Sequence, residues 1–173
     1  MDEELQTISS KAKVAEARHA AKALLKAANI KSAPVKINEL IKFLPKEFNL
    51  VIRGTKNHLP NGLDAFTHKE PNLTIIGYNQ NVALVRQKFS IAHELGHLYM
   101  GHLHGQSSID LDTNDHDEIE ANQFAAHLIM PTIMIKSDIK AGLKQVELLA
   151  KRYVVSEEAM WWQLSKSGLI KLL

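Results

Sequence analysis

The chain contains the stretch His93-Glu94-Leu95-Gly96-His97, in which two histidines lie four residues apart and a glutamate follows the first. On an α-helix, residues with this spacing share a face and lie about 6 Å apart along the axis, so both imidazoles can reach one point in space. Such a pair suits a zinc ion, and Glu94 stands where its carboxylate can take a proton from water that the metal activates. The neighbouring residues are apolar, and this indicates a buried helix in which unpaired imidazoles would be costly.

The composition limits which side chains can hold a metal. The 173 residues include nine histidines and no cysteine. Thiolate zinc sites, iron–sulfur clusters, disulfide scaffolds and cysteine proteases are therefore excluded, and imidazole and carboxylate groups must hold any transition metal. The hydrophobic fraction of 45% and the charged fraction of 23% are typical of an ordinary globular domain. The net charge of +2 favours neither the presence nor the absence of a nucleic-acid partner.

A catalytic zinc site needs a third protein ligand and one open position. The longer pattern, in which a third histidine follows a glycine turn, fails because Met100 and Leu103 stand at the glycine and histidine positions. His102 lies one residue before the histidine position of that pattern, and only an unusual loop would bring it to the metal. The better candidates are Glu118 and Glu120, at the start of the next expected helix.

Helical geometry favours Glu118 over Glu120 as the third ligand. The small residue Ala121 shares a face with Glu118, so two helices can approach closely along that line. Asn122, one turn after Glu118, can hydrogen-bond a ligating histidine from the side away from the metal. Glu120 lies on a different side of the helix. The alternative for either acid is a solvated first-turn residue placed for the helix dipole.

Two stretches resemble the ImmA/IrrE family of zinc metallo-endopeptidases. Residues 86–92 lead into the two histidines, and residues 118–131 carry Glu-x-x-Ala-Asn-x-Phe-Ala and end in Met-Pro. With weaker similarity upstream, the resemblance covers about residues 20–135. It implies a compact zincin-like α+β fold, in which a small antiparallel sheet packs on the helix that bears HExxH.

By motif position, the resemblance implies roles for four residues. His93, His97 and Glu118 would be the Zn²⁺ ligands, and Glu94 would be the general base. A donor to the oxyanion of the transition state is also expected. Four nearby side chains could serve as that donor, and none is assigned: Tyr99, His102, His104 and His116.

The resemblance further implies a substrate. Members of the family typically cleave a helix-turn-helix transcriptional repressor at a specific site, often in phage, mobile-element or stress-response circuits. The expected function is therefore that of a zinc-dependent endopeptidase whose protein substrate is such a repressor. The alternative is a non-hydrolytic zincin-fold protein that sequesters a repressor or toxin partner and holds the metal structurally. Glu94 favours the enzyme, because a structural site has no need of a carboxylate there.

The apolar periodicity predicts the order of helices and strands. Helices are expected at 9–29, 37–44, 82–100, 118–130, 142–152 and 157–166, and strands at 49–53, 63–68 and 73–78. The last two strands would form a hairpin around the turn at 69–72. Residues 101–117 are expected to form a long loop. We expect a metallopeptidase core at 1–135 and a C-terminal helical extension at 136–173 that packs on it.

The last two expected helices have the spacing of a helix-turn-helix. However, Val154 stands where the turn usually has glycine, and the second helix begins with two acids that DNA phosphates would repel. We therefore expect no direct contact with nucleic acid. These helices should instead pack on the core through four side chains: Leu149, Met160, Leu164 and one of Trp161 or Trp162.

The sequence offers no signal for export or membrane insertion. The N-terminus Met1-Asp2-Glu3-Glu4 is acidic, whereas a signal peptide begins with basic residues. The longest uncharged runs, 72–85 and 121–135, are shorter than the roughly 18–20 apolar residues of a spanning helix. We expect a cytoplasmic protein without a membrane partner.

Overall fold

The computed structural model of the chain describes residues 2–57, 59, 62–102 and 115–173. The helices are α1 (Asp2–Ala27), α2 (Ile37–Leu40), α3 (Leu84–Met100), α4 (His116–Ile129), α5 (Thr132–Lys140), α6 (Val146–Tyr153) and α7 (Glu157–Lys166). The strands are β1 (Leu50–Thr55), β2 (Ala65–Glu70) and β3 (Leu73–Asn79). Each predicted helix and strand is present, with shifted ends, and the fold belongs to the α+β class. The middle of the predicted loop at 101–117, with His104, lies outside the described residues.

The strands form one sheet in the order β1-β3-β2. The predicted hairpin is confirmed, because β2 and β3 pair antiparallel, with Phe66 opposite Gly77. β1, however, pairs parallel with β3, so the sheet is mixed and the expectation of a purely antiparallel sheet is wrong. β3 takes the central position because it carries buried side chains such as Thr74 and Ile76. The chain therefore cannot follow a simple meander in which β1 lies beside β2.

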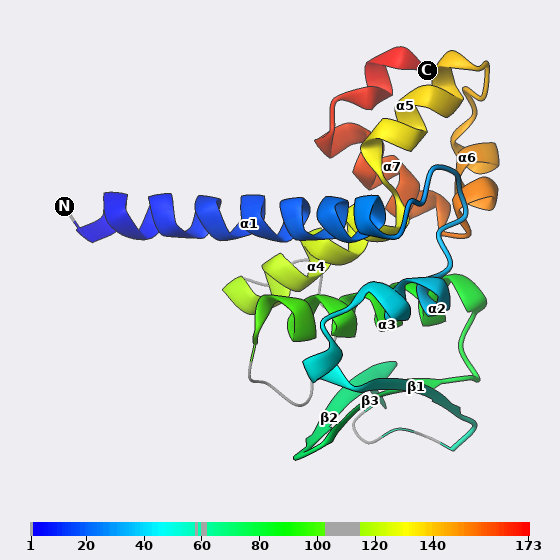
Figure 1. Cartoon of the computed structure of the whole chain (residues 1–173). Coiled ribbons are helices and arrows are strands. Elements are labelled where there is room, and N and C mark those ends of the chain that lie inside the picture. The colour runs from blue at the N-terminus through cyan, green and yellow to red at the C-terminus, as the bar shows by residue number, and fades with distance from the viewer. Residues whose placement is uncertain (1, 58, 60–61, 103–114) are drawn as a thin grey trace.

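Helix α3 lies between the sheet and helices α4 and α1 (Figure 1). It contacts β2 and β3 on one side and α4 on another, and α4 in turn contacts α1. The two central helices cross closely at Gly96, where an added Cβ would lie 3.0 Å from the Cα and from the carbonyl oxygen of Ala121. The close approach that the small side chain of Ala121 predicts is therefore observed. It fixes how α3 and α4 lie against each other at Gly96.

Helix α5 was not expected from the sequence. Pro131 directly follows Met130, the C-cap of α4, and it is also the residue directly before α5. Proline suits the start of a helix because the amide there has no partner within the helix. Ile135 and Ile139 of α5 are buried in the core, so the segment is held by packing.

Helices α6 and α7 pack on the core through Leu149, Met160 and Leu164, as expected. The expectation that one tryptophan would join them is wrong, because Trp161 is 55% exposed and Trp162 is 38% exposed. On α7, the side chain of Gln163 points into the core instead of either tryptophan.

A hydrogen bond holds the buried side chain of Gln163 in place. Gln163 is buried, and its amide donates a 3.0 Å hydrogen bond to the carbonyl of Met130 at the end of α4. The side chain of Ser156 caps α7, as its position ahead of two acids indicates. Among the residues that the structure describes, no helix is long and apolar enough to cross a membrane.

Candidate metal centre

Three side chains from two helices meet at one point. The Nε2 atoms of His93 and His97 on α3 lie 3.0 Å apart, and each lies 3.2 Å from an oxygen of Glu118 on α4. A tetrahedral zinc ion with bonds of about 2.0–2.1 Å separates its ligand atoms by roughly 3.3 Å. The spacing of these three groups therefore matches that of ligands around one small cation.

The hydrogen bonds around the cluster leave electron pairs facing its centre. His93 Nδ1 lies 2.9 Å from Asn122 Oδ1, the contact that the position of Asn122 predicts. Because an amide oxygen only accepts, the hydrogen of neutral His93 is on Nδ1 and its Nε2 presents a lone pair. No described residue satisfies the buried Glu118 Oε2 with a hydrogen bond. Converging lone pairs repel one another, and a cation between them removes that cost, so the donor set fits a metal.

Glu118 is ionised at neutral pH. Burial alone would raise the pKa of its carboxyl, but the hydrogen bonds and positive charge that His93 and His97 supply when they are protonated, with no metal between them, outweigh burial and lower the pKa to about 2. The carboxylate is the form that binds a metal. The Glu118 side chain is 16% exposed, whereas both histidines are buried, so the site meets solvent on the side of α4.

The structure brings Glu118, and not Glu120, to the two histidines. Glu120 is buried and contacts His102 with one carboxylate oxygen, 3.1 Å from His102 Nε2. The alternative that either acid is a solvated first-turn residue does not hold for Glu120, since only 3% of its side chain is exposed.

The Glu94 side chain of α3 is buried and lies against strand β2. Its carboxylate accepts a 2.6 Å hydrogen bond from the hydroxyl of Thr67 on β2. Thr67 is not among the site residues predicted from sequence. Its sequence signal is the alternation of a strand, which places Thr67 on the same face as Ala65, and both are buried while Phe66 between them is less so.

The four candidate oxyanion donors lie in different surroundings. Tyr99 packs its ring against Phe48 and Phe124, with centroids 6.2 Å and 5.5 Å away. His102 contacts the far nitrogen of His97, and His104 lies outside the described residues. His116 is the exposed first residue of α4.

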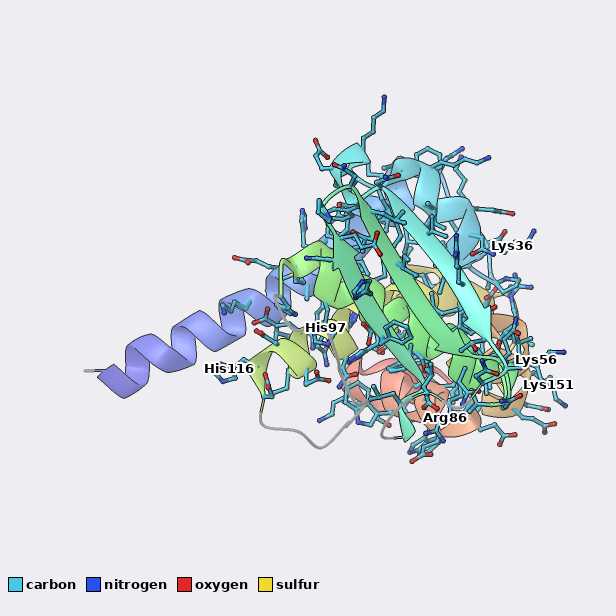
Figure 2. The ribbon with its side chains drawn as sticks, turned by 90° about the horizontal axis from the view of Figure 1, so that it is seen from below. Lys36, Lys56, Arg86, His97, His116 and Lys151 are labelled. Carbon is cyan, nitrogen blue, oxygen red and sulfur yellow. The ribbon has the colours of Figure 1, made fainter. Side chains whose placement is uncertain are left out.

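The site lies to one side of the sheet. In Figure 2, His97 and His116 lie to the left of the strands, on the side from which α1 projects, and Arg86 near the start of α3 lies at the lower right. Arg86 pairs there with the carboxylate of Asp64, which fixes the start of α3 against the segment before β2.

A cavity of about 630 Å³ lies elsewhere, between α1 and the start of α5. Its lining includes Arg18, Lys22 and Lys26 of α1, and His127 of α4. His127 stands more than two turns beyond Glu118 along α4. The cavity is therefore separate from the metal centre, and no residue of the cluster lines it.

The fold and the site together define a class of protein. A buried helix with two histidines four residues apart, a glutamate facing them from a second helix, and a small sheet below are features of a zincin-like metallopeptidase. The sequence matches the family described as the IrrE N-terminal-like domain, a metallopeptidase family, over residues 46–165, and the chain belongs to that family. The resemblance drawn from the two sequence stretches is confirmed.

A solved structure supports the same fold. A Mycobacterium tuberculosis transcriptional regulator aligns with a TM-score of 0.64 and 18% sequence identity, covering 87% of this chain and 46% of the regulator. At that identity the likeness concerns the fold alone. This chain thus spans less than half of the regulator's length. No curated protein matches the sequence.

Proposed function

We propose that the protein is a zinc-dependent endopeptidase, in which His93, His97 and Glu118 bind Zn²⁺ and Glu94 is the general base. The observation that carries this proposal is the convergence of two imidazole nitrogens and an ionised carboxylate within 3.2 Å of one another. The absence of cysteine supports imidazole and carboxylate ligation. Zinc is the metal that most often takes such a set in a buried site with an open position.

Each protein group has a defined task in this proposal. A bound zinc ion would supply Lewis acidity, which brings the pKa of water toward about 7 and polarises a peptide carbonyl. Glu94 accepts the proton of the attacking water and passes it to the leaving amine. Thr67 holds one oxygen of the Glu94 carboxylate during this exchange, because the hydroxyl is already within hydrogen-bond distance.

The sheet supplies a surface for an extended substrate. β2 is an edge strand, and no strand in the described ranges pairs with it on the side away from β3. An extended peptide can add to such an edge through backbone hydrogen bonds. Since Thr67 of β2 contacts Glu94, a peptide paired with β2 would run beside the general base.

We further propose that the substrate is a helix-turn-helix transcriptional repressor, cleaved at a specific site in the cytoplasm. Support comes from the family to which the chain belongs and from the fold shared with a transcriptional regulator. The acidic start of α7, Glu157 and Glu158, favours a protein partner over direct contact with nucleic acid. The division into a core at 1–135 and an extension at 136–173 stays a prediction.

The experiment compares the wild type with Glu94→Gln, both loaded with zinc, on helix-turn-helix regulators encoded beside the gene. Glutamine keeps the size of the side chain but cannot accept the proton, so cleavage should fall by about 10²–10⁴-fold while zinc content stays the same. Equal binding of a regulator by both proteins, with cleavage by neither, would instead establish the non-hydrolytic alternative.

A further inference from the structure

A second group of titratable side chains lies behind His97, on the side away from the metal centre. His102 Nδ1 lies 2.9 Å from His97 Nδ1, and His102 Nε2 lies 3.1 Å from Glu120 Oε2. Only 7% of the His102 side chain and 3% of the Glu120 side chain are exposed. The three residues therefore form a continuous buried chain of contacts that begins at a proposed metal ligand.

The end of helix α3 places His102 in this chain. Gly101 adopts a left-handed conformation with φ of 77°, which terminates the helix and turns the backbone back. The amide of His102 then donates a 2.9 Å hydrogen bond to the carbonyl of His97. This pattern of helix termination fixes residue 102 beside residue 97 regardless of the loop that follows.

The positions of the hydrogens follow from the chemistry of imidazole. When His97 Nε2 holds a metal, its hydrogen must be on Nδ1, and it donates to His102 Nδ1. His102 then carries its own hydrogen on Nε2, from which it donates to the Glu120 carboxylate. Each of these two contacts has one donor and one acceptor. The second carboxylate oxygen of Glu120, Oε1, accepts no hydrogen bond from a described residue and faces the ammonium of Lys13 at 3.9 Å.

We propose that His102 and Glu120 are positioning residues that hold His97 in the tautomer and orientation needed to bind the metal. The inference rests on the proposed zinc site. His93 is held differently, by the neutral amide oxygen of Asn122. The site thus uses a neutral acceptor behind one ligand and a histidine–carboxylate pair behind the other. A carboxylate at the end of the pair makes the His97 nitrogen a stronger electron donor than an amide would.

A second metal site is the competing interpretation of the same residues. His102, Asp117 and Glu120 each offer a ligand atom within 4.8 Å of the others. If both His97 and His102 bound metals through Nε2, both Nδ1 atoms would carry hydrogens, facing each other at 2.9 Å with no acceptor. Lys13 Nζ also lies 3.9 Å from Glu120 Oε1 and already places positive charge there. The geometry therefore favours hydrogen bonding over a second cation.

The test uses the full chain loaded with zinc and three variants. His102→Ala removes the acceptor, His102→Asn restores an oxygen where Nδ1 stands, and His68→Ala removes an exposed histidine on β2 as a control. Zinc affinity is measured by competition with a chelator. We expect His102→Ala to weaken zinc binding by about 10–100-fold, His102→Asn to recover most of that loss, and His68→Ala to leave affinity unchanged.

Nitrogen NMR of the zinc-loaded wild type gives a readout that a merely structural role would not produce. His102 should show hydrogen on Nε2 and an accepting Nδ1, with one zinc ion per chain. This spectrum decides the question even if His102→Ala does not fold. Unchanged zinc affinity in a folded His102→Ala overturns the proposal, as does a second zinc ion bound to His102 Nε2.

The same measurements separate this inference from the proposed function. If substitutions of His93 and Glu118 weaken zinc binding but substitution of His102 does not, the zinc site is supported and the positioning role of His102 is rejected. A wild type that binds no zinc overturns both.

Discussion

Thr67 on strand β2 donates a 2.6 Å hydrogen bond to the carboxylate of Glu94 on helix α3. The contact joins the edge of the sheet to the proposed general base, in a region where both side chains are buried. A hydrogen bond to a charged group in the interior is worth more than one at the surface. The strand therefore determines where the Glu94 carboxylate points.

Replacing this hydroxyl should slow catalysis without affecting the metal. Thr67→Val keeps the shape of the side chain and removes the donor, so we expect kcat to fall by about 10- to 100-fold, the range for one hydrogen bond to a charged group. Zinc content should stay at the wild-type level, because Thr67 contacts no metal ligand in the described contacts. Thr74→Val, at a buried position on β3, serves as the control. Equal loss of activity in both variants would point to a general weakening of the sheet.

The identity of the third ligand can be tested by a matched pair of substitutions. Glu118→Gln removes the negative charge that faces both imidazoles, and we expect zinc affinity to fall by more than about 100-fold. Glu120→Gln retains an oxygen that can accept from His102, so its loss should be much smaller. Chelator competition on both purified variants measures the difference. The reverse order would assign the metal to Glu120.

The cluster of His93, His97 and Glu118 was predictable because its geometry is local. His93 and His97 share a helix face by spacing alone, and the choice of Glu118 follows from the face it shares with Ala121. Helical periodicity fixes such relationships before any tertiary structure is known. The same reasoning predicts the contact between Asn122 and His93.

The remaining features depend on contacts that no periodicity encodes. Thr67 reaches Glu94 only because β2 lies against α3, and His102 meets Glu120 only because α4 crosses α3 at Gly96. The parallel pairing of β1 likewise depends on which strand is central, and local propensity does not determine that. Gln163 differs from these features, because periodicity does place it on the helix face of the buried Met160 and Leu164, where its amide donates to the carbonyl of Met130.

The crossing of α3 and α4 should be intolerant of one added carbon. Gly96→Ala would place a Cβ 3.0 Å from two backbone atoms of Ala121, which cannot rotate away. We expect the helices to separate, with about 1–3 kcal/mol of lost stability in chemical denaturation and weaker zinc binding as Glu118 moves from the histidines. Gly54→Ala is the matched control, because its Cβ would meet only the flexible Gln80 side chain. An equal effect of the two substitutions would contradict the role of the crossing.

Stability should also depend on pH through Lys88, whose ammonium donates a 2.6 Å hydrogen bond from α3 to the carbonyl of Tyr153. Burial lowers the pKa of Lys88 from 10.5 to about 8. Between these values the unfolded chain holds a proton on Lys88 that the folded chain has lost, so the contribution of Lys88 to the free energy of unfolding should rise as the pH increases from 8 to 10.5. Below pH 8 both states are protonated, and the buried charge lowers stability by a constant amount.

The measurement is urea denaturation at several pH values across that window. The difference between the wild type and Lys88→Met should shift in favour of the wild type as the pH rises, whereas Lys56→Met, at an exposed lysine, should follow the wild type throughout. Tyr153 acts in the opposite direction at the top of the window, because burial and its hydrogen bond to Asp138 raise the pKa of its phenol above the 10.0 of the unfolded chain. The wild type and both variants share this contribution, so it cancels in the differences between them. Parallel curves for the wild type and Lys88→Met would show that the folded protein keeps Lys88 charged, and that this contact between α3 and α6 carries no desolvation cost.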